Sequence, residues 1–103
     1  MTSLVLRLSL ILSFRTRETA RLARGERVRQ WEPFRQQAER RLRWLEAAAS
    51  LADLAFYRSN RLEALRGDRA GQYSIRINLQ WRICFEWAAG APGPSNVEIV
   101  DYH

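Results

Sequence analysis

The stretch QYSIRINLQWRICFEW, residues 72–87, decides the fold of this chain. On both sides of Asn78-Leu79, apolar side chains occupy every second position: Tyr73, Ile75 and Ile77 before it, and Trp81, Ile83, Phe85 and Trp87 after it. A period of two is typical of a strand with one buried face. The short connection between the two runs predicts an antiparallel hairpin that carries Arg76 and Arg82 on its opposite, polar face.

Two more strands are expected beside this hairpin. Residues 61–65 precede a turn, residues 66–71, whose Gly67 and Gly71 suit backbone conformations with positive φ. Residues 88–95 contain two glycines and two prolines, which favour a loop, and residues 97–102 form the final strand. Strands that follow one another at such short spacing pair antiparallel.

The N-terminal segment also alternates, with leucine or phenylalanine at every even position from Leu4 to Phe14. We expect a strand over residues 4–14, with residues 1–10 as an extension ahead of the folded domain. A secretory signal is not expected, because Arg7 and two serines break the apolar run and no basic stretch precedes it. The run is also shorter than the ~20 residues that a membrane span needs.

Helices are expected between the first strand and the hairpin. Residues 16–30 predict a short helix that ends near Gly25, and residues 32–49 predict a longer one with Pro33 in its first turn. The longer helix has one apolar stripe at spacings of three and four: Phe34, Ala38, Leu42, Leu45 and Ala49. Residues 50–53 (SLAD) resemble a capping box that opens another helical turn. The element order predicts an α+β domain with helices against one face of a sheet.

The length and composition predict one folded domain, residues 1–103, and the charge predicts an anionic partner. The net charge is +6, and all seventeen basic residues are arginines, whose planar guanidinium suits phosphate oxygens. Nucleic acid, the ribosome, an acidic protein and a membrane surface are the partner classes that this charge favours. The single cysteine, Cys84, forms no disulfide within the chain and fits a reducing cytoplasm. One cysteine and one histidine do not make a zinc site, and no glycine-rich phosphate loop precedes a helix.

The histidine is the last residue, His103, where core packing has no use for it. Imidazole exchanges protons near neutral pH, and Asp101 is placed to orient it. With arginines to hold the developing charge, these residue types permit metal-free RNA cleavage, in which the ribose 2′-hydroxyl attacks the adjacent phosphate. The candidate phosphate-binding residues are Arg66, Arg69, Arg76 and Arg82.

Strand geometry constrains this site. Asp101 and His103 project from one side of a regular strand, and Tyr102 projects from the other. Arg76, Arg82 and one side of the last strand are therefore expected to line a polar sheet surface. Two alternatives remain open for Tyr102: it joins that surface, or it packs in the core.

Three segments resemble a known family: NRLEALRGDRAGQYSIRIN (residues 60–78), QWRICF (80–85) and VEIVDYH (97–103). Together they resemble the HigB, or plasmid maintenance killer, toxins of the RelE/ParE toxin–antitoxin superfamily. ILSFR (11–15) and GERV (25–28) are similar to that family's opening, so the resemblance covers residues 11–103.

The resemblance implies a RelE-like fold, with an N-terminal strand and two to three helices packed on a curved antiparallel sheet. It implies a cytoplasmic, ribosome-dependent mRNA endonuclease that needs no cofactor and is silenced by a HigA-like helix-turn-helix antitoxin. The resemblance assigns catalytic roles to Asp101, Tyr102, His103, Arg66 and Arg82. Apart from the resemblance, we expect RNA contacts from Arg61, Arg69 and Arg76. Some relatives have a catalytic histidine where this chain has Glu63, which is able to act as a base but not as a cationic acid.

Two other functions remain open on the same fold. One is a ParE-like inhibitor of gyrase, although the intact Asp-Tyr-His ending argues against it. The other is a weakened toxin that only binds antitoxin or ribosome, which the change to Glu63 motivates. Cleavage of translated mRNA, altered DNA supercoiling, or ribosome binding without cleavage distinguishes the three.

Overall fold

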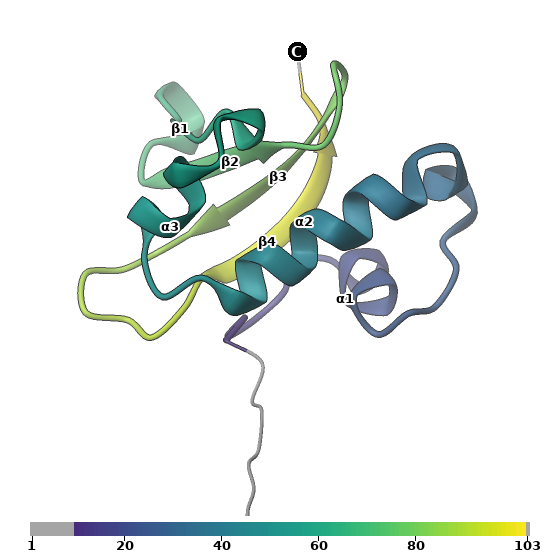
Figure 1. Cartoon of the computed structure of the whole chain (residues 1–103), viewed down its shortest axis with the longest axis horizontal. Helices are drawn as coiled ribbons and strands as arrows, with labels where there is room; N and C mark the ends of the chain where they lie inside the picture. The colour runs from purple at the N-terminus through teal and green to yellow at the C-terminus, as the bar shows by residue number, and fades with distance from the viewer. Residues whose placement is uncertain (1–9, 103) are drawn as a thin grey trace, which may run out of the picture.

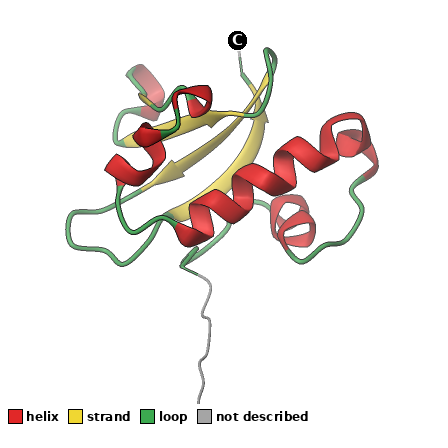
Figure 2. Ribbon diagram, viewed as in Figure 1, coloured by secondary structure: helices red, strands yellow, loops and turns green. Residues whose placement is uncertain are grey.

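The alternating segments form a four-stranded antiparallel sheet with the strand order β1–β2–β3–β4. This computed structural model describes residues 10–102. Each strand neighbours the next in sequence, because short turns join them. Figure 2 shows how short the first strand is beside the other three. The strands are β1 (Glu63–Ala64), β2 (Gln72–Arg76), β3 (Trp81–Glu86) and β4 (Ser95–Asp101).

Strand register separates the side chains of the sheet into two faces. Ile75, Ile83 and Ile99 align across β2, β3 and β4, and all three are buried. Residues one position away lie on the opposite side of the sheet. We call this opposite side the polar face, and it carries Ser74, Arg76, Arg82, Cys84 and Glu98.

Three α-helices precede the sheet in the described part of the chain (Figure 1): α1 (Arg17–Ala23), α2 (Arg35–Ala47) and α3 (Leu51–Phe56). The α1 helix starts at Thr16, whose hydroxyl accepts a hydrogen bond from the Thr19 amide at 3.2 Å. It ends before Gly25, which has a φ of +90° and so needs the freedom of glycine. Short 3-10 segments are η1 (Arg29–Phe34), η2 (Arg58–Asn60) and η3 (Gly67–Arg69).

The core lies between the helices and the apolar face of the sheet. Ala38, Leu42 and Leu45 of α2 belong to one buried cluster with Ile75 and Ile83. The helices thus cover one side of the sheet, as the sequence predicts for an α+β domain, and leave the polar face uncovered by them. This packing buries only one face of the sheet, which explains why apolar and polar side chains alternate along the hairpin strands.

Local differences from the expected elements have physical reasons. Pro33 lies in η1, so the α-helix begins at Arg35, and because α2 ends at Ala47, Ala48 is buried and Ala49 exposed. Ser50 begins α3 without a side-chain cap, although Asp53 accepts a hydrogen bond from the Ala49 amide at 2.7 Å. The strand expected over residues 61–65 is reduced to Glu63–Ala64. The left-handed backbone of residue 61 prevents an earlier start, and the Leu65 amide still donates to the Gln72 carbonyl at 2.9 Å.

The described part of the N-terminal segment runs beside the start of β4, to which Ser13 and Arg15 are joined by backbone hydrogen bonds with Val97. A parallel bridge joins Phe14 to Val97 of β4, where a strand was expected over residues 4–14. The side chains do not follow the expected faces, because Ile11 is buried while Leu12 is 51% exposed. The carbonyl of Leu10 lies against Gly93 so closely that a Cβ on that glycine would overlap it. Residues 1–9 of the expected strand and extension lie outside the described residues.

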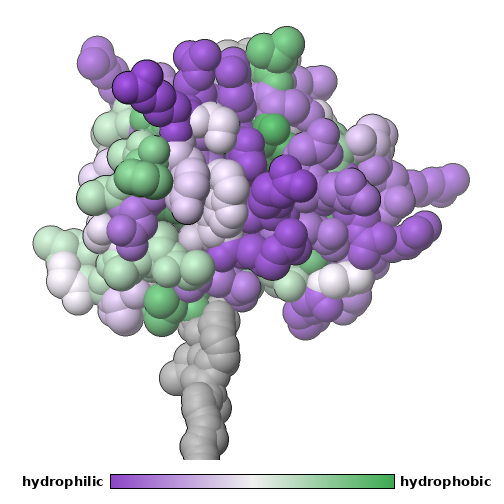
Figure 3. Space-filling view, in the orientation of Figure 1, coloured by the Kyte–Doolittle hydropathy of each residue, from purple (hydrophilic) through white to green (hydrophobic). Residues whose placement is uncertain are grey.

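The surface is unevenly polar. In the orientation of Figure 1, hydrophilic side chains gather over the N-terminal half of α2, and more apolar ones gather over α3 (Figure 3). None of the helices within residues 10–102 has the length and apolar character that a bilayer crossing requires.

Candidate active site on the polar face

The guanidinium of Arg82 lies at the centre of the polar face. Its Nε donates a hydrogen bond to the Ser74 hydroxyl at 2.7 Å, and its Nη2 donates to the Arg61 carbonyl at 2.6 Å. The side chain is only 11% exposed. Burial lowers the pKa of Arg82, and nearby Glu63 opposes that shift. Since arginine titrates far above neutral pH, the group keeps its charge, and the hydrogen bonds offset part of its lost hydration.

Arg82 borders a hollow of about 300 Å³ that opens on the polar face. Arg76 faces Arg82 across β2 and β3, and Glu63 Oε1 lies 3.7 Å from Arg82 Nη2. The Glu63 side chain is 55% exposed, so this ion pair is largely screened by water. The hollow is lined by Arg61, Leu62, Glu63, Arg76 and Arg82. We call it the arginine hollow.

Tyr102 joins this face. In the last strand Asp101 pairs with Trp81, and the Tyr102 amide donates to the Gln80 carbonyl at 2.9 Å. This register directs Tyr102 to the side of Arg82, whose guanidinium carbon lies 5.8 Å from the tyrosine ring centre. Of the two alternatives left open by the sequence, the structure supports the polar surface. Asp101 is on the other side, where it accepts a hydrogen bond from Gln80 Nε2 at 2.9 Å.

Two predicted arginines lie apart from the arginine hollow. Arg66 is exposed at the start of η3 and does not line it. Arg69 binds Glu98 at 3.1 Å and Gln72 at 2.8 Å. Burial acts to lower the pKa of Arg69, but the hydrogen bond that it donates to Glu98 and the nearby negative charges together outweigh this effect, and the pKa is raised. His103 lies outside the described residues.

Ser74 is the main residue of this region that sequence reasoning did not select. The alternation already placed Ser74 on the same strand face as Arg76. What the sequence does not contain is the register that brings Ser74 within hydrogen-bonding distance of Arg82.

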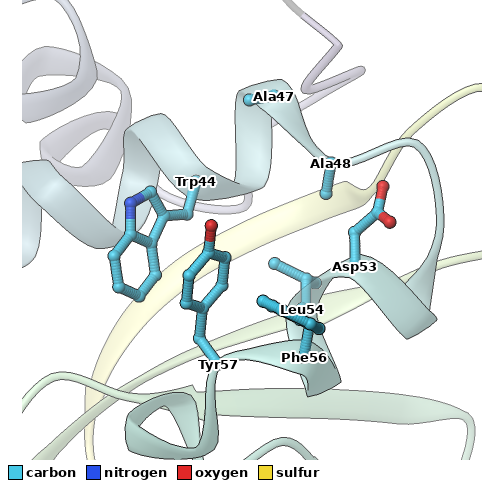
Figure 4. Close-up of a pocket in the computed structure, with 7 residues that line it drawn as sticks. All are labelled: Trp44, Ala47, Ala48, Asp53, Leu54, Phe56 and Tyr57. Atoms are coloured by element: carbon cyan, nitrogen blue, oxygen red, sulfur yellow. The ribbon is translucent and has the colours of Figure 1, made fainter.

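A second, largely apolar hollow lies away from the polar face, between α2 and the segment 53–57 (Figure 4). Trp44 and Tyr57 stack there with ring centres 4.7 Å apart, and Phe56 is 79% exposed. Asp53 contributes a carboxylate to this hollow, and one oxygen of that carboxylate accepts a hydrogen bond from the Ala49 amide. None of the described residues that line this hollow is basic, so it lacks a group that would hold a phosphate, and we place no chemistry in it.

The polar face, by contrast, combines the groups that phosphate chemistry uses. Fixed guanidinium groups stabilise negative charge on phosphate oxygens, and a carboxylate and a phenol exchange protons. Arg82 supplies a fixed guanidinium at the arginine hollow, and Arg76 and Arg61 add positive charge to its lining. Glu63 and Tyr102, at its edge and beside Arg82, supply the second.

Comparison with known proteins gives two matches. A family described as the RelE-like toxin of type II toxin–antitoxin system HigB matches residues 13–103. Toxin HigB-1 of Vibrio cholerae serotype O1 is 43% identical over 51 residues, which are 50% of this chain and 54% of that protein. The aligned part thus spans about half the length of this curated relative.

Proposed function

The chain belongs to the HigB-like family of RelE-like toxins of type II toxin–antitoxin systems, and from that premise we propose that it is a ribosome-dependent mRNA endonuclease. The proposal extends to the partners: translated mRNA on the ribosome as substrate, and a HigA-like helix-turn-helix antitoxin as inhibitor. The net charge of +6 supports an RNA partner, because phosphate contacts dominate the affinity of proteins for nucleic acids.

The observation that carries this proposal is the fixed guanidinium of Arg82 beside Glu63 and Tyr102. RNA cleavage by the 2′-hydroxyl needs a positive group that is already oriented when negative charge builds up on the phosphate. A preorganised donor of this kind contributes roughly 10²–10³-fold to the rate. Arg82 meets this requirement, because protein groups hold it on two sides.

The proposed reaction is a metal-free transesterification. A base removes the proton from the 2′-hydroxyl, the 2′-oxygen forms a bond to phosphorus, and the bond from phosphorus to the 5′-oxygen breaks. An acid protonates that leaving oxygen, so the products are a 2′,3′-cyclic phosphate and a 5′-hydroxyl. We assign charge stabilisation to Arg82 with Arg76, and proton transfer to His103 and Tyr102, with Glu63 as a further base. Asp101, two positions before His103 in the chain, is proposed to orient the imidazole. Because Asp101 lies on the side of β4 away from Arg82, this role requires the chain to depart from regular strand geometry after Asp101.

The test is to express the chain from an inducible promoter and map the new RNA 5′ ends. We expect growth arrest and cuts within translated messages, and no cuts in a message whose start codon has been removed. Deletion of His103 and, separately, Arg82→Ala are each expected to lower cleavage by at least about 10²-fold. Ser95→Ala, which changes the far end of the same face, serves as the control and should cleave normally.

Other outcomes would overturn the proposal. Growth arrest with intact mRNA and altered plasmid supercoiling would instead indicate a gyrase inhibitor. Co-sedimentation with ribosomes without cleavage of any translated message would indicate a binding module. Undiminished cleavage after loss of both Arg82 and His103 would move the active site elsewhere.

A further inference from the structure

We propose that Ser74 and the backbone carbonyl of Arg61 are positioning groups, which fix the Arg82 guanidinium so that its Nη1 amino group binds a phosphate in the arginine hollow. This inference rests on the proposed ribonuclease function for its substrate class. It assigns a role to a residue, Ser74, that touches no substrate and acts through Arg82.

Ser74 is suited to this role by burial and by distance. Its side chain is fully buried in β2, and its hydroxyl lies 2.7 Å from Arg82 Nε. The Ser74 carbonyl adds a longer contact of 3.5 Å to Arg82 Nη2. Ser74 is paired with Glu63 of β1 on one side and with Cys84 of β3 on the other, so the sheet holds its backbone in place. The hydroxyl therefore fixes the plane of the guanidinium.

Arg61 contributes through its backbone. Its φ of 47° and ψ of 51° place a residue other than glycine in the left-handed region, which carries a steric cost. Strained backbone of this kind persists where the surroundings enforce it, and it clusters at functional sites. Here the conformation directs the Arg61 carbonyl to within 2.6 Å of Arg82 Nη2.

These contacts leave one amino group of Arg82 available to a ligand. Nε and Nη2 of Arg82 are engaged by Ser74 and Arg61, whereas Nη1 has no hydrogen bond to any residue within 10–102. Nη1 carries two N–H groups, and Arg82 lines the arginine hollow with Arg76. A phosphate in the hollow would thus meet a donor whose direction is set before binding, which lowers the entropic cost of binding.

The experiment follows the Arg82 Nε–H resonance by NMR in the full chain, assigned by its loss in Arg82→Lys. Ser74→Ala should shift this resonance and speed its exchange with water roughly tenfold, because the hydroxyl acceptor is gone. When Ser74→Ala is titrated with inorganic phosphate, its dissociation constant should be roughly fivefold higher than that of the unchanged chain. Ser74→Thr retains a hydroxyl and should restore both values toward those of the unchanged chain.

Two controls separate positioning from general effects. Ser95→Ala removes a hydroxyl from the same sheet face, and that hydroxyl bonds to none of the described residues, so neither measurement should change. Arg61→Gly removes a side-chain charge but keeps a carbonyl in the left-handed conformation. It should weaken phosphate binding without moving the Arg82 resonance.

An Arg82 resonance that is identical in Ser74→Ala and the unchanged chain would overturn the inference, as would an unchanged phosphate affinity. If Ser74→Ala fails to fold, Ser74→Cys provides the same comparison with a weaker acceptor of similar volume. The two proposals can also be overturned separately. If the unchanged chain cleaves no RNA but Ser74→Ala shows the expected NMR changes, only the ribonuclease function is overturned. If the unchanged chain cleaves RNA but the Arg82 resonance does not move in Ser74→Ala, only the positioning role is overturned.

Discussion

At the scale of single residues, Cys84 shows how dry the inner part of the polar face is. It is fully buried in β3, opposite Ser74 and Glu98 in the neighbouring strands. Burial raises the pKa of the Cys84 thiol. The reactive species of cysteine is the thiolate, so burial and the raised pKa both protect the Cys84 side chain from alkylation. We therefore regard Cys84 as a packing residue between Ser74 and Glu98 and not as a nucleophile.

This shift predicts a specific pH dependence of stability. As pH rises past the ordinary thiol pKa, the unfolded chain loses the Cys84 proton before the folded chain does. The contribution of Cys84 to stability is therefore complete below that pKa and is lost as pH rises through the folded value. We expect Cys84→Ala to lose less stability than the unchanged chain across this alkaline range. Urea unfolding at a series of pH values measures the difference, and parallel curves would contradict the assignment.

At the scale of elements, sequence alternation and structure agree where a strand is paired along both of its edges. β2 and β3 follow the expected period because Ile75 and Ile83 are buried while Arg76 and Arg82 are on the other side. Within residues 10–15 of the N-terminal segment, the one bridge to the sheet is at Phe14, so alternation in this described part did not produce a regular strand. Alternation predicts a strand only where a partner strand supplies hydrogen bonds along its length.

The candidate site was predictable in its residue types but not in its assembly. The sequence indicated that Arg76 and Arg82 share a polar face, and the structure brings them together at the arginine hollow. The side of the sheet on which Tyr102 lies depends on the register between β3 and β4. Alternation within one strand does not predict that register. Arg69 pairs with Glu98 29 positions away, a contact that local pattern also does not contain.

Glu98 joins three separate segments and should matter for stability. Its carboxylate binds Arg15 at 3.3 Å and Arg69 at 3.1 Å, which connects β4 to the N-terminal segment and to η3. Removing one partner of a buried ion pair leaves the other charges desolvated. Because both arginines are partly exposed, we expect Glu98→Ala to cost about 1–3 kcal/mol, less than a fully buried pair would.

Denaturant unfolding measures this cost, with Glu26→Ala as the matched control. Glu26 also pairs with two arginines, Arg21 and Arg24, which lower its pKa, but it lies on the surface. Exposed ion pairs contribute little to stability, so this control should unfold like the unchanged chain. Equal losses in the two variants would show that the Glu98 cluster behaves as a surface ion pair.

At the scale of the whole molecule, positive charge occurs on two opposite sides of the sheet. One side is the polar face, which carries Arg76 and Arg82 at the arginine hollow. The other is the helical layer that covers the apolar face, where Arg43 of α2 is exposed. The net charge of +6 is a sum over the whole chain, so composition alone does not show which side of the sheet binds RNA.

Salt dependence distinguishes these two sides, given the proposed RNA partner. Each lost phosphate contact reduces the slope of log affinity against log salt by about 0.7 for single-stranded nucleic acid. We expect Arg76→Gln to reduce the slope by about this amount for ribosomes programmed with mRNA. Arg43→Gln removes the same charge from the helical layer and should leave the slope unchanged. A reduction in Arg43→Gln alone would place the RNA-binding surface on the helices and leave the arginine hollow without its proposed substrate.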